Sequence, residues 1–154
     1  PIYLKKIADM TNKNTEDRLL RLVYIKNAIM IGAADSIDLA EEVISKNDVY
    51  SSHEKFEAYS ELGNLFQLNE PNVSTIKIRT RIKKIFDEAL VNENNPAIIE
   101  VIDNAMSKGA EGYHNSEQRK MILKKFENVD NYPFQKKYFQ QELQKIDPEK
   151  KEEN

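Results

Sequence analysis

The chain has 154 residues, a formal net charge of −3 and neither cysteine nor tryptophan. The missing cysteine excludes disulfide scaffolds and Cys-ligated zinc sites, and the length fits one globular domain. Charged residues make up 32% of the chain and apolar residues 40%, a balance typical of globular rather than disordered sequences.

Apolar residues recur with helical spacing along nearly the whole chain, and no stretch shows the alternation of a β-strand. The first helix is predicted to begin at Thr15, a capping residue type, and to end at Gly32. Its buried face is expected to be a broad set of apolar residues: Leu19, Leu20, Leu22, Val23, Ile29 and Met30.

Two further helices are predicted in the next stretch of the chain. An acidic helix is expected from about Ser36. Ser51 and Glu54 have the spacing of a capping box, in which each side chain accepts a hydrogen bond from the other's backbone, and open a third helix. Its inward residues are expected to be Phe56, Tyr59, Leu62 and Phe66.

The second half of the chain contains four more helix starts. Pro71 interrupts the pattern before the first of them. An N-cap followed by proline at the first helical position is a particularly clear start signal. The starts are Asn72 or Ser74, Asn95-Pro96, Ser116 and Asn131-Tyr132-Pro133.

The spacing of these starts predicts an all-α fold with about seven antiparallel-packed helices, because the links between them are short. Either a helical-repeat α-α superhelix or a compact multi-helix bundle fits this pattern. We expect residues 1–147 to form a single domain. Residues 148–154 are mostly Lys and Glu and are expected to be a frayed tail.

One pair of helices resembles a tetratricopeptide repeat. Residues 57–69 are similar to its first helix at the Leu-Gly and aromatic positions, here Leu62, Gly63 and Phe66. Residues 83–96 are similar to the end of its second helix, here at Ala89, Leu90 and Pro96. The stretch between the two matches is longer than in that repeat. The resemblance implies a scaffold that binds peptides or partner proteins on a concave face.

The sequence contains little that indicates catalysis. It has two histidines, His53 and His114, each expected near the start of a helix and in solvent. Gly-rich phosphate loops, nucleophile elbows and calcium-loop signatures are absent from the sequence. The sequence therefore predicts no enzyme activity, no catalytic residue, no cofactor and no metal site.

Charge segregation indicates a surface for a partner. Residues 35–61 carry eight acidic residues against two basic ones, and Asp38, Glu41 and Glu42 lie close together on the predicted second helix. On the last predicted helix, Phe134 and Tyr138 form a second apolar stripe beside the core stripe. Either the segment around Tyr113 and Tyr132 covers this stripe, or the stripe is exposed and can anchor a partner protein or a symmetry mate.

The predicted fourth helix supports an alternative, since residues 74–86 carry five basic residues and no acidic one. Lys77, Arg81 and Lys84 fall on one flank of the helix and could contact nucleic acid. The net charge of −3 disfavours strong non-specific binding of that kind. A simpler interpretation is that the basic helix packs beside the acidic second and third helices, with modest surface pairing.

We therefore expect a non-enzymatic helical interaction domain, an adaptor, scaffold or regulatory module, that binds another protein or a second copy of itself. A nucleic-acid-associated regulator or accessory protein is the alternative. No apolar run approaches the ~20 residues of a membrane span, and no signal-peptide core is present. We therefore expect no membrane contact and a cytoplasmic location.

Overall fold

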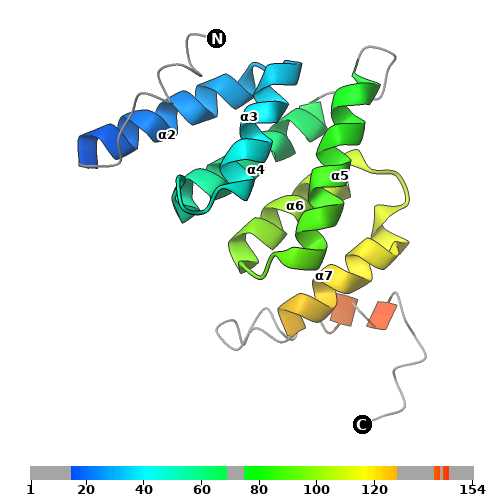
Figure 1. The fold of residues 1–154 in the computed structure, drawn as a ribbon. Helices are drawn as coiled ribbons and strands as arrows, with labels where there is room; N and C mark the ends of the chain where they lie inside the picture. Colours follow the sequence, from blue (N-terminus) through cyan, green and yellow to red (C-terminus); the bar gives the residue numbers. More distant parts are fainter. Residues whose placement is uncertain (1–14, 69–74, 128–140, 143, 146–154) are drawn as a thin grey trace. The chain divides into compact units, whose positions relative to one another are not determined.

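The computed structural model describes residues 15–68, 75–127, 141–142 and 144–145. Within these residues the chain forms six α-helices and one short 3-10 turn, and it forms no strand (Figure 1). The all-α prediction is confirmed, and the helix count is close to the predicted seven. The start expected at Asn131 lies outside the described residues.

The chain divides into two compact units, Pro1–Ile85 and Phe86–Asn154, and the boundary between them falls within the sequence of one helix. The described helices of the first unit are α2 (Thr15–Met30), α3 (Ala34–Ser45), α4 (Ser52–Leu68) and the first part of α5 (Ile76–Asn92). The second unit holds the rest of α5, α6 (Pro96–Gly109), the turn η1 (Tyr113–Asn115) and α7 (Glu117–Glu127). A single domain over residues 1–147 stays a prediction, and residues 148–154 lie outside the described residues.

The predicted capping residues set several helix starts. At α4, the Ser51 N–H donates to Glu54 Oε1 at 2.8 Å and the Glu54 N–H donates to Ser51 Oγ at 3.2 Å, which confirms the capping box. At α6, the Asn95 side chain accepts from the Ala97 N–H at 3.0 Å, and proline occupies the first turn. At α7, Ser116 Oγ accepts from the Arg119 N–H at 3.2 Å. Each cap satisfies backbone donors that a helix start leaves open.

At the junction between α2 and α3, α2 ends where predicted, but α3 begins earlier than predicted. Gly32 has φ +71° and follows α2, as predicted, and a Cβ at this position would lie 2.9 Å from Leu65 Cδ2 of α4. Helix α3 begins at Ala34, two residues before the predicted start. Ser36 instead lies inside its first turn, where its Oγ accepts from the Ala33 N–H at 3.2 Å.

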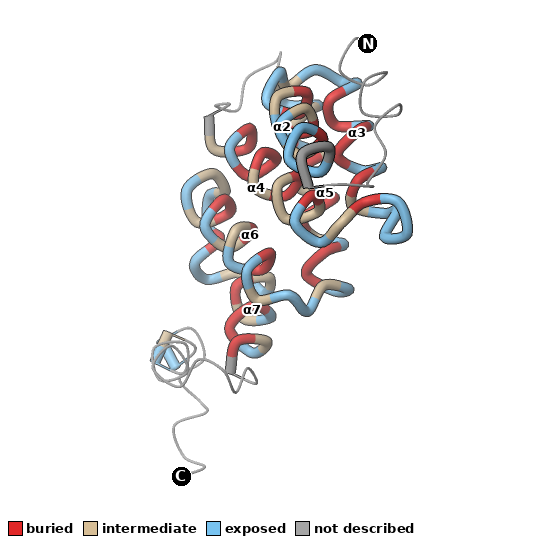
Figure 2. The backbone as a smooth tube through the Cα atoms, turned by 90° about the vertical axis from the view of Figure 1, so that its left-hand side faces the viewer, coloured by how far each residue is buried: buried red, intermediate tan, exposed pale blue. Residues whose placement is uncertain are grey.

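The core of the first unit forms where α2, α3 and α4 pack pairwise against one another. Each of these helices has a buried strip and an exposed strip (Figure 2). Tyr59, Leu62 and Phe66 are buried, as predicted, and Phe56 is half-buried. The innermost apolar side chains of the three helices include Ile25, Ile29, Ile37, Ala40, Val43, Ala58 and Leu62.

The core of the second unit forms between α6, η1 and α7, which contact one another. Tyr113 of η1 is buried and extends the core beyond the two helices. The buried aliphatic side chains of the second unit include Ile98, Ile99, Ile102, Met106, Ile122 and Leu123. Phe86 and Phe126 are also buried, so aliphatic and aromatic side chains together form the core of this unit.

Candidate functional site

The acidic residues of α3 and the basic residues of α5 meet in the first unit. Arg81 Nη2 lies 2.8 Å from Asp38 Oδ1 and 3.2 Å from Glu41 Oε1. Its other terminal nitrogen donates to the Ala34 carbonyl at 3.5 Å. Two residues predicted to bind a protein partner thus pair with one predicted to bind nucleic acid. All three remain at least one-third exposed, so solvent screens these pairs.

The other predicted contact residues occupy different positions. Glu42 pairs with Lys46 at 3.1 Å, one turn along α3. Lys77 and Lys84 are exposed on α5. Of the predicted acidic and basic residues, the structure therefore brings together Arg81, Asp38 and Glu41, where opposite charges already pair.

Arg79, on the same helix, turns inward instead. Its side chain is buried, donates a hydrogen bond to the Phe66 carbonyl near the end of α4, and lies 4.2 Å from the centre of the Phe66 ring. A buried guanidinium at a helix C-terminus satisfies a carbonyl that has no intrahelical partner. Arg79 therefore joins α4 to α5 rather than contributing to a basic surface.

The outer side of α2 presents a row of exposed apolar side chains. We call this surface the α2 apolar face; it comprises Leu19, Leu20, Val23, Met30 and Ile31, which are 43–64% exposed. The prediction that Leu19, Leu20, Val23 and Met30 form the buried side of this helix is wrong. The helix packs on α3 and α4 through Ile25, Ala28 and Ile29, which lie on its opposite side.

The geometry of the α2 apolar face follows from helical periodicity. At 100° per residue, Leu19, Val23 and Met30 fall within about 40° of one another. Leu20 and Ile31 widen the face on one flank. One signal of this surface was available in the sequence, because apolar residues of α2 surround more than half of the helix. A helix with one buried side needs only one apolar stripe.

A charged pair borders the α2 apolar face on the side of α4. Lys26 Nζ lies 3.8 Å from Glu57 Oε1, and the side chains are 51% and 20% exposed. At about 20° from Leu19 on the helical projection, Lys26 is directly beside the apolar row. The apolar row and the charged pair form one continuous surface.

A second carboxyl group lies beneath this pair. Glu61 is one turn from Glu57 on α4 and is only 3% exposed. Burial raises the pKa of Glu61, and the negative charge of Glu57 adds to the effect, while Asn64 and Lys26 lower it by less. The Glu61 carboxyl therefore holds its proton to a higher pH than a solvated glutamate does.

A buried ion pair joins α2 to the start of α4. Arg21 Nε and Nη2 donate to the two carboxylate oxygens of Glu54, both at 2.5 Å, and Nη2 also donates to the Val49 carbonyl at 2.9 Å. The guanidinium lies 5.1 Å from the centre of the Tyr50 ring. Burial alone would raise the pKa of Glu54, but the hydrogen bonds from Arg21 and Ser51 outweigh it and hold the pKa below its usual value. Sequence reasoning identified Glu54 as a cap and missed Arg21.

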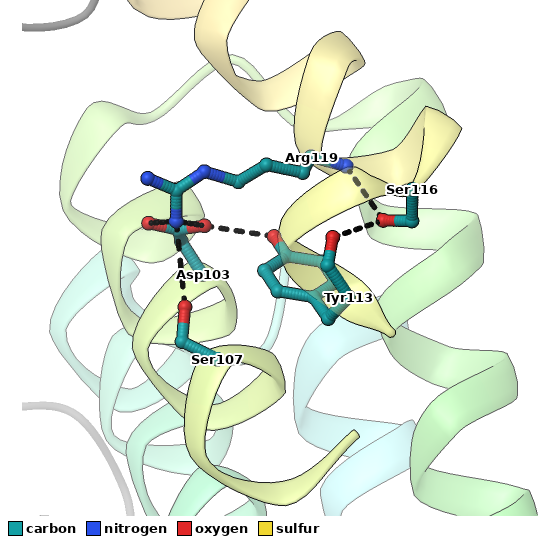
Figure 3. A network of polar contacts seen from close by, with 5 residues as sticks. All are labelled: Asp103, Ser107, Tyr113, Ser116 and Arg119. Carbon is teal, nitrogen blue, oxygen red and sulfur yellow. Dashed lines mark hydrogen bonds and ion pairs between the residues drawn. The ribbon is translucent and has the colours of Figure 1, made fainter. Parts of the chain in front are cut away.

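The second unit holds a comparable network around Asp103 of α6 (Figure 3). Asp103 Oδ1 accepts from the Tyr113 hydroxyl at 2.8 Å, and Arg119 Nη1 donates to both carboxylate oxygens at 2.9 and 3.1 Å. Arg119 also donates to Ser107 Oγ at 3.4 Å. Burial, followed by the adjacent Asp103 charge, raises the pKa of Tyr113 well above its usual value. The network joins α6, η1 and α7 through groups that satisfy one another.

In the described part of the chain, both histidines, His53 and His114, are exposed. In the described ranges, no group of three or more His, Asp or Glu side chains is placed to hold a metal ion, and no helix has the length and apolarity to cross a membrane. Phe134 and Tyr138, predicted to contact a partner, lie outside the described residues.

No protein family model, curated protein or solved structure matches the chain. The segments that resemble a tetratricopeptide repeat lie on α4 and at the end of α5, and the resemblance itself stays a prediction.

Proposed function

We propose that this chain is a non-enzymatic helical domain that binds another protein molecule through the α2 apolar face. The exposure of five large apolar side chains, four on α2 and one on the residue that follows it, is the observation that carries this proposal. Apolar surface left in water costs about 25 cal/mol per Å², so covering these side chains favours association. Clustered apolar exposure of this kind is typical of interaction surfaces.

The buried charges of the two units support the same proposal. Arg21 with Glu54, and Arg119 with Asp103, are paired inside their own units. Tyr113, whose pKa is also raised, donates to Asp103. These groups thus have structural partners, so a structural role rather than acid–base chemistry fits them.

The pairing of Arg81 with α3 favours a protein partner over nucleic acid. A phosphate contact at Arg81 would have to compete with Asp38 at 2.8 Å and Glu41 at 3.2 Å. These three side chains keep enough exposure to contribute polar contacts around an interface. We also propose a cytoplasmic location, as expected from the sequence.

A site-specific photocrosslinking experiment tests the proposal. A photoreactive amino acid at Val23, on the α2 apolar face, should form covalent adducts with a protein partner in cells. The matched control is the same amino acid at Val91 of α5, which is 67% exposed and lies outside this face. Adducts at position 23 and not at position 91 are the expected result. Equal labelling, or no protein adduct at position 23, contradicts the proposed function.

A further inference from the structure

We infer that the α2 apolar face binds the same face of a second copy of this chain, with the two α2 helices antiparallel. This inference rests on the proposed function, since it names the partner of the same surface. It is supported by the pattern of apolar and charged side chains along α2 and its border with α4. A symmetric contact requires a surface that is complementary to itself.

The apolar row has the form that a helix-to-helix contact needs. Leu19, Val23 and Met30 follow one line along the helix, and the distance from the first to the last spans about 16 Å at 1.5 Å per residue. In an antiparallel pair centred between these ends, Leu19 of one copy faces Met30 of the other. Val23 then lies near the two-fold axis, in the best-protected part of the contact.

The charges beside the row are complementary under the same symmetry. A two-fold axis perpendicular to both helices keeps the α4 flank of one copy on the same side as the α4 flank of the other. Lys26 and Glu57, which are 3.8 Å apart in each copy, therefore meet the corresponding pair of the second copy. Each lysine can then lie close to the other copy's glutamate, so opposite charges alternate around the axis.

The lysine side chain is suited to this position for a second reason. Lys26 is half-exposed and its charge is already paired with Glu57, so its carbon stem can lie against Val23 of the other copy. In a parallel arrangement the α4 flanks of the two copies would lie on opposite sides of the contact, so the two Lys26–Glu57 pairs would not meet. Only the antiparallel alignment brings the two pairs together, and it is therefore favoured.

The size of the surface determines how strong this association should be. The face lies on one helix of 16 residues and the residue that follows it, so its area falls at the low end of specific protein interfaces. We therefore expect a reversible dimer whose population rises with concentration. Its dissociation constant should lie between about 10 μM and 1 mM.

The first test measures the oligomeric state of the full chain by sedimentation velocity across that concentration range. The chain should convert from monomer to dimer, and Val23→Glu should raise the dissociation constant at least about tenfold. Val91→Glu is the matched control, because it places the same charge on another exposed apolar position and should leave the dimer unchanged. Circular dichroism should show that both variants keep the helical content of the wild type. A chain that stays monomeric to about 1 mM overturns the inference.

A charge-exchange experiment tests the complementarity directly. Lys26→Glu makes the charged border of the α2 apolar face negative, and Glu57→Lys makes it positive. Like charges then meet across the contact, so each variant alone should dimerise less than the wild type. An equimolar mixture should recover association as a mixed dimer, detected by energy transfer between differently labelled chains. A mixture no stronger than either variant alone would mean that these two residues do not face each other across the contact, and the inference would fail.

The absence of native cysteine allows a test of orientation. Chains carrying Leu19→Cys and chains carrying Met30→Cys should form a mixed disulfide when combined and oxidised. If disulfides form preferentially between two Leu19→Cys chains and between two Met30→Cys chains, the antiparallel arrangement is overturned.

Photocrosslinking at Val23 separates the inference from the proposed function. Adducts with the mass of two chains support the inference. Adducts with a different protein alone overturn it and leave the proposed function in place, whereas the lack of any protein adduct overturns both.

Discussion

Arg21 and Arg81 make the same kind of contact in the first unit, but in different surroundings. Each guanidinium bridges two helices by binding carboxylates. The Arg21 and Glu54 side chains are 5% and 4% exposed, whereas Arg81 and Asp38 are 35% and 65% exposed. Removing one partner of the buried pair leaves an unpaired charge in the core, whereas at the exposed pair water replaces the lost partner. The energetic consequence of an ion pair is therefore set by burial more than by distance.

The largest expected effect is the loss of Arg21. Arg21→Ala leaves Glu54 buried without its bidentate partner and should lower the free energy of unfolding by about 3–5 kcal/mol. Urea unfolding followed by circular dichroism measures the change. Arg18→Ala, at an exposed position of the same helix, is the matched control and should change stability by about 0.5 kcal/mol or less.

A double variant determines how much of this loss comes from the stranded charge. Replacing both partners by apolar residues, Arg21→Met with Glu54→Leu, should recover most of the stability lost in Arg21→Ala. The recovery will be incomplete because Glu54 also caps α4 through Ser51. If the double variant is as unstable as the single one, the stranded charge is not the cause.

The network around Asp103 extends the comparison to the second unit. Asp103→Ala removes the common acceptor of Arg119 and Tyr113 and should destabilise the chain by about 2–3 kcal/mol, less than the loss at Arg21 because Asp103 is more exposed. Urea unfolding measures the loss. Near-ultraviolet circular dichroism should change as well, since the Tyr113 ring loses its partner. An effect below about 0.5 kcal/mol would contradict a structural role.

The two buried glutamates of α4 should respond to pH in opposite directions. The raised pKa of Glu61 makes its contribution favourable below the usual glutamate pKa of about 4.5, and this contribution is lost as pH rises through the higher pKa of the folded state. The lowered pKa of Glu54 gives a contribution that is present above about pH 4.5 and lost in more acidic solution.

The substitution Glu61→Gln isolates the first of these contributions. The variant should be more stable than the wild type at pH 7, and the difference should shrink below pH 4.5, as thermal unfolding at several pH values would show. Glu100→Gln, at an exposed position of α6, is the control for the loss of one glutamate charge. A wild-type advantage at pH 7 would contradict the raised pKa of Glu61.

The smallest expected effect is at the surface pair. Arg81→Ala should cost at most about 1 kcal/mol, and the cost should fall further in 1 M salt, because solvent already screens this contact. Urea unfolding at two salt concentrations measures both quantities. A salt-independent loss as large as that of Arg21→Ala would remove the distinction between the two arginines.

Sequence patterns located the helices well but not the surfaces that the helices use. The capping box of Ser51 and Glu54 and the Asn95-Pro96 start are confirmed, and Gly32 ends α2 where predicted. The predicted buried side of α2 is wrong for Leu19, Leu20, Val23 and Met30. Helical periodicity shows which residues share a side of a helix, but a helix that is apolar around most of its circumference does not reveal which side is covered.

The sequence by itself determined the starts capped by Ser51, Asn95 and Ser116 and the stop of α2 at Gly32, because caps join residues only two to four positions apart. Only the tertiary structure decided where the charges of Arg21 and Arg81 are neutralised and which side of α2 stays exposed. Those outcomes depend on partners 33 and 43 positions away, and on how α3 and α4 pack against α2. Burial is a property of the packed helices together, and it is burial that separates a charge held in the core from one that water can screen.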